Sequence, residues 1–159
     1  MGTQQILLIV LSVIIVGAAI AVGIQMFNSQ AYSANKSAIA ADAQSFATQV
    51  VQYYKTPESQ GGAGGKVVSM TAANVFPFIG WSAVNTNNDS GDYIITDASA
   101  AAADGSFTVA IYGLGKEIRA TNRPAIETVI SFPDGTITAT PKDVTSTTAI
   151  AGVPALFTP

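Results

Sequence analysis

The chain has 159 residues, of which 48% are hydrophobic and only 11% are charged, against roughly 25% charged in ordinary soluble domains. It lacks cysteine, which excludes disulfides and thiolate chemistry, and it lacks histidine, the commonest general base near neutral pH. The net charge of −3 provides no basic surface for nucleic acid. We therefore expect a non-enzymatic protein with no cofactor, no metal and no nucleic-acid partner.

Residues 1–27 contain an uncharged apolar run, and the first charged side chain of the chain is Lys36. The run from Ile6 to Phe27 reads ILLIVLSVIIVGAAIAVGIQMF. About 20 such residues suffice to cross a bilayer as a helix, so a plain membrane anchor is one interpretation. A signal peptide is disfavoured, because Met1 to Gln5 contain no Lys or Arg and no helix breaker follows the run.

Residues 28–56 continue the helix, without Pro or Gly from Asn28 to Lys55. Apolar residues recur at alternating spacings of four and three, which predicts one buried face; these residues are Ile39, Ala43, Phe46, Val50 and Tyr53. Pro57 and the Gly-rich linker over residues 57–66 end the helix. Its length, about 80 Å, exceeds what a small head can cover.

The apolar half must therefore be buried elsewhere, either in lipid or against copies of itself in an assembly. Its lack of charge suits a helix that is packed on all sides, since unpaired ions are costly there. Gly17 and Gly23 permit close helix approach and weaken the helix locally. We expect this stretch to be loosened or partly unwound in the assembly.

Residues 67–159 change period and predict a β-rich head, which makes the fold class α+β with a small antiparallel sheet. The segments 92–96 and 107–113 are rich in β-branched and aromatic residues and are predicted strands. Residues 126–132 and 136–140 flank Pro133-Asp134-Gly135 and predict a β-hairpin.

The rest of the head gives weaker signals. Residues 67–70 predict an edge strand or a short helix. Residues 74–81 supply aromatic side chains that seal the sheet against the helix, with a carbohydrate-binding patch as the alternative. Residues 85–91 predict a polar surface loop, and the tail from Pro141 onward is predicted to be extended rather than helical.

Polar residues offer few candidate sites. A calcium site is conceivable at three aspartates, but the spacing of a calcium-binding loop is absent, which favours a solvated loop; these residues are Asp89, Asp92 and Asp97. Four charged residues between 117 and 127 can pair with each other or with a neighbouring subunit. Asn35 and Asn88 begin N-glycosylation sequons, and Asn88 is the better candidate.

Taken together, the short polar N-terminus, the uncharged apolar run, its unbroken amphipathic continuation and the Gly-rich loop before a β-rich head resemble type IV pilins. The resemblance covers the first third of the chain. Gln5 stands where bacterial pilins usually carry a glutamate, so the pairing of that carboxylate with a neighbour's amine is not available here. A proline in the apolar half and a C-terminal disulfide loop are also absent. A divergent bacterial pilin is favoured over an archaeal one.

The resemblance implies a major structural subunit of an extracellular pilus, inserted in the inner membrane before assembly into a helical homopolymer. Implied partners are other copies, a prepilin peptidase and the pilus assembly machinery. The resemblance also implies that Met1 is the processed, N-methylated end. The residues expected in assembly are Met1, Gln4, Gln5, Ile6, Leu7, Ile9, Val10, Val13, Ile14, Gly17, Gly23 and Phe27. The alternatives are a pseudopilin or minor pilin of a type II secretion or DNA-uptake machine, and a membrane-anchored periplasmic or extracellular binding module.

Overall fold

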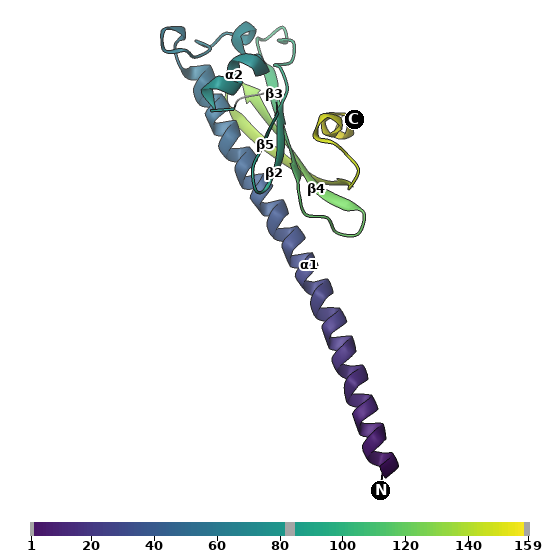
Figure 1. Ribbon diagram of the computed structural model, residues 1–159. Helices are drawn as coiled ribbons and strands as arrows, with labels where there is room; N and C mark the ends of the chain where they lie inside the picture. Colours follow the sequence, from purple (N-terminus) through teal and green to yellow (C-terminus); the bar gives the residue numbers. More distant parts are fainter. Residues whose placement is uncertain (1, 82–84, 158–159) are drawn as a thin grey trace.

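The structure, a computed structural model, describes residues 2–81 and 85–157 and confirms the α+β class. One helix, α1 (Gly2–Lys55), packs its C-terminal half on a β-sheet and projects its N-terminal half away from the head (Figure 1). At 1.5 Å per residue α1 is about 81 Å long. It ends one residue before Thr56-Pro57, as predicted, because the residue before a proline avoids helical geometry.

The sheet has five antiparallel strands that follow one another in space as they do in sequence. They are β1 (Asn85–Asn87), β2 (Gly91–Ile95), β3 (Phe107–Gly115), β4 (Asn122–Phe132) and β5 (Thr136–Thr145). The predicted hairpin around Pro133-Asp134-Gly135 is confirmed, with Ser131 opposite Thr136. Its strands run further than predicted, to Asn122 opposite Thr145.

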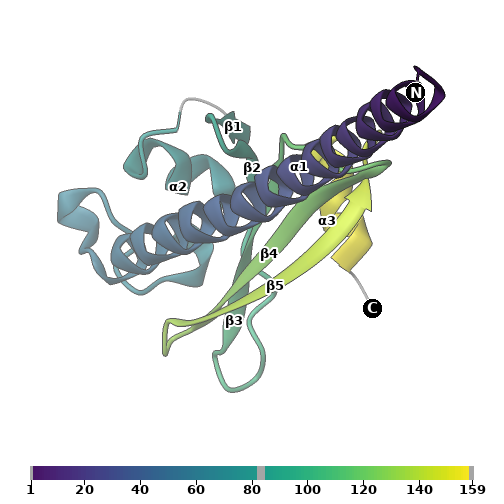
Figure 2. The ribbon, with the colours of Figure 1, turned by 90° about the horizontal axis from the view of Figure 1, so that it is seen from below.

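The two faces of the sheet are covered by different elements, α1 on one side and the C-terminal helix α3 (Val153–Phe157) on the other (Figure 2). Side chains alternate across a strand, so β3 and β4 supply both cores. The larger core lies under α1 and includes Val109, Ile111, Ile126 and Ile130. The smaller core lies under α3 and consists of Tyr112, Leu114, Ala125, Val144 and Val153.

The predicted buried face of α1 is confirmed. Ile39, Ala43 and Val50 are fully buried and Tyr53 nearly so, whereas Phe46 lies partly buried at its edge. The periodicity missed two buried residues of α1, Tyr32 and Ala47.

The predicted aromatic seal is also present, on the short helix α2 (Ala72–Phe78) and just beyond it. Phe76 and Trp81 are buried, and the Phe46 ring meets Trp81 edge-on at 4.9 Å between centroids. Three-residue 3-10 helices lie before α2, η1 (Glu58–Gln60) and η2 (Val67–Ser69). The second settles the alternative left open for residues 67–70 in favour of a short helix.

Two predictions about the head are wrong. The stretch 85–91 is not wholly a loop, because β1 pairs with β2 over Asn85–Asn87. The tail from Pro141 is not extended throughout: β5 continues to Thr145, and the chain then turns back into η3 (Ile150–Gly152) and α3. The tail turns back because the face of β3 and β4 opposite α1 is apolar. The fully buried Val153 covers part of that face.

Candidate functional site

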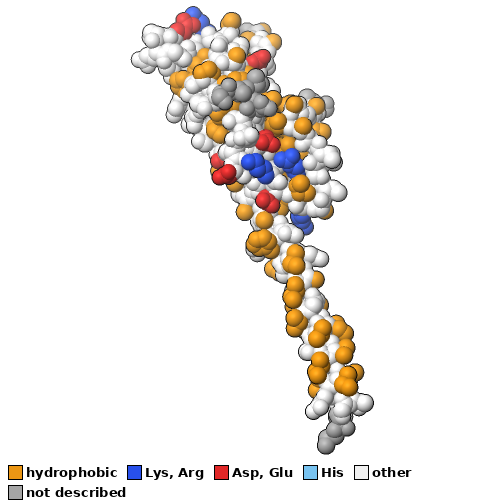
Figure 3. Space-filling view, in the orientation of Figure 1, with side chains coloured by type: hydrophobic (Ala, Val, Ile, Leu, Met, Phe, Trp, Pro, Cys, Tyr) orange, Lys and Arg blue, Asp and Glu red, His pale blue; other side chains and the backbone are white. Residues whose placement is uncertain are grey.

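The N-terminal half of α1 carries an uncharged apolar surface that nothing in the described part of the chain covers. The large apolar side chains expected in assembly range in exposed fraction from 51% at Val10 to 70% at Phe27. They are Ile6, Leu7, Ile9, Val10, Val13, Ile14 and Phe27. Figure 3 shows hydrophobic side chains along the projecting helix, whereas charged ones gather on the head. A contiguous apolar surface of this length marks contact with lipid or with other chains.

The small and polar residues of this half of the helix are exposed as well. A Cβ added at Gly17 or Gly23 would meet no atom within 4 Å, so nothing inside the subunit requires glycine there. The helix is nevertheless continuous through both positions. Gln4 and Gln5 are exposed, and Met1 lies outside the described residues.

Within residues 2–81 and 85–157, α1 is the one helix long and apolar enough to cross a membrane. Its most apolar 18-residue window has no buried share. A helix from the core of a soluble protein would be largely buried, whereas a signal sequence shares both the length and the exposure. Length, composition and exposure together make α1 able to serve as a membrane anchor.

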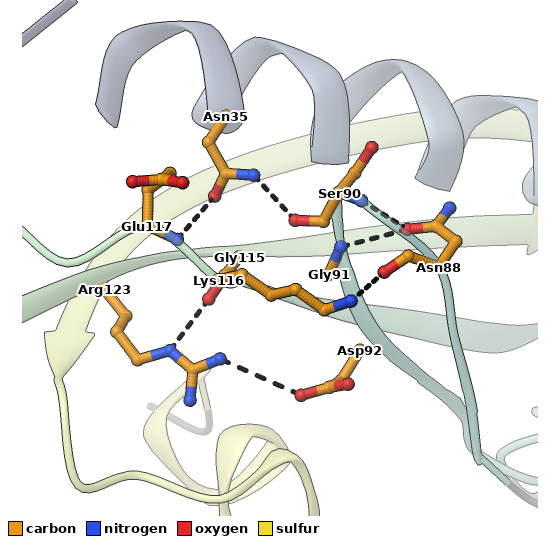
Figure 4. A network of polar contacts seen from close by, with 9 residues as sticks. All are labelled: Asn35, Asn88, Ser90, Gly91, Asp92, Gly115, Lys116, Glu117 and Arg123. Atoms are coloured by element: carbon orange, nitrogen blue, oxygen red, sulfur yellow. Dashed lines mark hydrogen bonds and ion pairs between the residues drawn. The ribbon is translucent and has the colours of Figure 1, made fainter. Parts of the chain in front are cut away.

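Where α1 meets the base of the head, a polar network joins the helix to two loops (Figure 4). The amide nitrogen of Asn35 donates to the Ser90 carbonyl at 2.6 Å, and its amide oxygen accepts from the Glu117 N–H at 3.3 Å. A Cβ at Gly115 would collide with that amide oxygen, so this close approach requires glycine. Arg123 Nε donates to the Gly115 carbonyl at 2.8 Å. The network holds both loops against one turn of α1.

Two turns further along α1, Asp42 binds Tyr93 of β2 and Asn88 of the turn that precedes it. Its Oδ2 accepts from the Tyr93 hydroxyl and from the Asn88 amide nitrogen, each at 2.8 Å. The Asn88 amide oxygen accepts the N–H groups of Ser90 and Gly91, both at 2.9 Å, which fixes the turn before β2. Burial, and to a smaller extent the hydrogen bond to the Asp42 carboxylate, raises the pKa of the Tyr93 hydroxyl well above its usual value. The one signal for this contact in the sequence is weak, a single acid beside the apolar face of α1.

Both sequon asparagines therefore have structural partners. The amide nitrogen that would carry a glycan donates a hydrogen bond in both residues. In Asn35 it donates to the Ser90 carbonyl, and in Asn88 to Asp42 Oδ2. Both residues are half-buried. A glycan at either position would have to displace part of the contact between α1 and the head.

An ion pair ties α1 to the edge strand β5. Lys36 Nζ lies 2.8 Å from Asp143 Oδ1, and this hydrogen bond lowers the pKa of the Asp143 carboxyl. Burial, together with the nearby Asp143 carboxylate, raises the pKa of Tyr32 to about 12. These groups are aligned along one side of α1, just beyond its uncharged part.

The four charged residues between 117 and 127 do not pair with each other among the described residues. Arg123 instead lies 3.8 Å from Asp92 Oδ2, and Glu127 accepts a 2.8 Å hydrogen bond from the Tyr112 hydroxyl. Burial, and to a smaller extent the hydrogen bond to the Glu127 carboxylate, raises the pKa of the Tyr112 hydroxyl to about 12. Arg123 and Glu127 therefore contact other residues of the head, whereas Glu117 and Arg119 are exposed.

The aspartates considered for calcium are separated. Asp92 faces Arg123, Asp97 Oδ1 accepts the Ala72 N–H at the start of α2, and Asp89 is exposed. Across residues 2–81 and 85–157, no group of three or more acidic side chains is arranged to hold a metal ion. Asp89 therefore lies in an exposed loop, whereas Asp92 belongs to β2 and Asp97 holds the start of α2.

No protein-family description, curated protein or solved structure matches the chain. What stands is the architecture: a long apolar N-terminal helix packed through its second half on an antiparallel sheet. This arrangement is compatible with that of a type IV pilin.

Proposed function

We propose that the chain is the structural subunit of a type IV pilus-like extracellular filament, without enzymatic activity. Residues 2–27 form the filament core by packing against the same segment of other copies, and the head forms the outer surface. Before assembly the same segment anchors the subunit in a membrane. A processing peptidase and an assembly machinery are the further partners that this proposal requires.

The observation that supports the proposal is the complete exposure of the uncharged half of α1. Fifteen large apolar side chains from Ile6 to Phe27 are more than half exposed. Burying each of them contributes roughly 1.5–3 kcal/mol relative to water. They surround the helix instead of forming one stripe, so a single flat partner would leave part of them in water. A bundle of identical helices, like a bilayer, covers all sides at once.

The test introduces one charge into the apolar half of α1 and, as a control, into its amphipathic half. Ile14→Asp and Val16→Asp should each abolish filaments, because an unpaired carboxylate in a dry helix bundle costs several kcal/mol. Gln44→Asp adds the same charge at an exposed position beside the head and should assemble normally. The full chain is examined by electron microscopy after detergent removal, with Trp81 fluorescence to verify the folded head. Normal filaments from both apolar-half variants would contradict the core assignment.

A membrane-anchored binding module is the second candidate, because α1 alone is long and apolar enough for an anchor. It makes a different prediction in the same experiment. The wild-type chain would then remain monomeric in detergent and would enter vesicles, but it would form no fibre after detergent removal.

A further inference from the structure

The loop between β3 and β4, residues 116–121, is the lowest part of the head on the side of the projecting helix (Figure 1). Its tip, Ile118 to Ala120, lines a cavity of about 260 Å³ together with Gln25 and Asn28 of α1. The tip of the loop therefore lies at the level of residues 25–28 along the helix.

When the apolar half of α1 spans a bilayer, residues 25–28 lie at the surface of the membrane. From Ile6 to Gln25 the helix rises about 29 Å, which matches the roughly 30 Å of a bilayer's hydrocarbon core. Gln25, near the end of the run, and Asn28, the first residue after it, then lie among the lipid headgroups. The tip of the 116–121 loop lies there with them.

The side chains of the loop suit such a place. Ile118 is 54% exposed although it is fully apolar, and its neighbour Arg119 is exposed and forms no ion pair within the described residues. The Arg119 backbone pairs with Asn122 in both directions, at 2.9 and 3.0 Å, so the turn is fixed. Ala120 completes the turn with a φ of 56°, a left-handed conformation that is unusual for alanine.

Arg119 lines a cavity with Tyr32 and Asp143, and it adds to the effect of Lys36 in lowering the pKa of the Asp143 carboxyl. That carboxylate is already paired with Lys36, so Arg119 has no ion pair of its own within the described residues. Lys116 donates its amine to the Asn88 carbonyl, and the backbone N–H of Glu117 is held by Asn35. The Glu117 carboxylate is exposed and is the single acid of the loop. A guanidinium forms paired hydrogen bonds with phosphate, the group that every phospholipid presents at this depth.

We infer that the 116–121 loop is a lipid-headgroup contact: Ile118 enters the boundary of the acyl chains and Arg119 binds lipid phosphate. The contact holds the head on the membrane surface before assembly. This inference rests on the membrane-anchored state within the proposed function. It adds a second attachment point, since an apolar side chain and an adjacent cation together favour the interface of an anionic membrane.

The chain contains no cysteine, so single-cysteine variants of the full protein can carry one environment-sensitive fluorophore each. Ile118→Cys reports the loop, Ile14→Cys reports the span, and Asp104→Cys reports an exposed loop at the opposite end of the head. Each is reconstituted in phosphatidylcholine vesicles with and without phosphatidylglycerol, and quenchers are attached to the lipids. We expect quenching at positions 14 and 118 and none at position 104.

The outcomes separate this inference from the proposal on which it rests. A label at position 118 as water-exposed as the one at 104, with position 14 in lipid, would overturn the loop contact and leave the anchor standing. A water-exposed label at position 14 would overturn both. A protected label at 118 that responds to the protein-to-lipid ratio and not to the lipid quenchers would assign the loop to contact between copies, which also contradicts the inference.

Charge variants test the phosphate contact itself. In vesicles with phosphatidylglycerol, Arg119→Gln should lower the ratio of lipid-bound to free loop about fivefold, the effect of one cation near an anionic surface. Arg119→Lys should retain part of the contact. Lys55→Gln removes the same charge from the far end of the head and should change nothing. Equal quenching at position 118 for wild type and Arg119→Gln would refute the role of Arg119.

Discussion

Replacing Tyr93 by phenylalanine removes a single hydroxyl from the contact that ties the middle of α1 to the sheet. Tyr93 is fully buried, and its hydroxyl donates to Asp42 Oδ2 at 2.8 Å. The phenyl ring that remains keeps its edge-on contact with Phe46, at 5.1 Å between centroids. The variant therefore tests the hydrogen bond and leaves the packing in place.

The expected loss follows from the partners that Asp42 retains. A hydrogen bond to a charged group contributes about 1.5–3 kcal/mol. Removing one partner also leaves the other as an unsatisfied hydrogen-bonding group. Asn88 continues to donate to the same oxygen, and Asp42 is half-buried, so water replaces part of the lost bond. We expect the free energy of unfolding to fall by about 2 kcal/mol, or about 30-fold in the folding equilibrium.

Urea unfolding of the full chain in detergent micelles measures this loss. Trp81, the single tryptophan, is buried between Phe46 and Phe76, so its fluorescence reports directly on the junction of α1 and the head. With a urea dependence of about 2 kcal/mol per molar, the midpoint should fall by about 1 M with an unchanged slope.

The matched control is Tyr54→Phe. Tyr54 packs against Phe107 and Phe132, but its hydroxyl forms no hydrogen bond among the described residues. Its loss should change the free energy of unfolding by less than about 0.5 kcal/mol. Equal midpoints for Tyr93→Phe and Tyr54→Phe would refute the assignment of stability to the bond with Asp42. A change confined to the slope would refute it as well.

Four further predictions follow from the same contacts. Val50→Ala opens a cavity under the sheet and should lower the free energy of unfolding by about 2 kcal/mol; an unchanged midpoint would contradict the core assignment. Asn35→Ala leaves two loops without their partner and should cost about 1–3 kcal/mol and speed amide exchange in residues 88–91; unchanged exchange would count against it. The pKa values of Tyr32 and Tyr112, raised from 10.0 to about 12, make the unfolded chain lose its phenolic protons first. Stability should be fully present below pH 10 and decline between pH 10 and 12, and a flat profile there would be the contrary result. Finally, the segment Gly17–Gly23, continuous in the isolated subunit, should be loosened in the assembly; unbroken α-helical density there in a filament map would disprove this.

Features that depend on near neighbours were determined by the sequence alone. The uncharged run before Lys36, the stop at Pro57 and the turn at Pro133-Asp134-Gly135 act through local geometry and local polarity, so each was predicted at its true place. The buried face of α1 was predicted for the same reason, because helical periodicity places its members on one side whatever lies opposite. Alternation along β3 and β4 similarly predicted a sheet, but not which face each helix covers.

Only the tertiary structure decided which distant residues meet. Asp42 and Tyr93 are 51 residues apart, and the partners of Asn35 lie 55 and 82 residues away, so no local pattern relates them. The tail folded into α3 because a core that β3 and β4 create needed Val153, a requirement invisible in the tail itself.

The level of the 116–121 loop along α1 is likewise decided by the tertiary structure. It depends on where the helix crosses the sheet, and that crossing is fixed by the fit of Ile39, Ala43, Ala47 and Val50 against the sheet. The sequence by itself therefore determined that the chain exposes a long uncharged helix. The tertiary structure decided which residues stand beside that helix where it leaves the head, because burial and hydrogen bonding select partners in space and not along the chain.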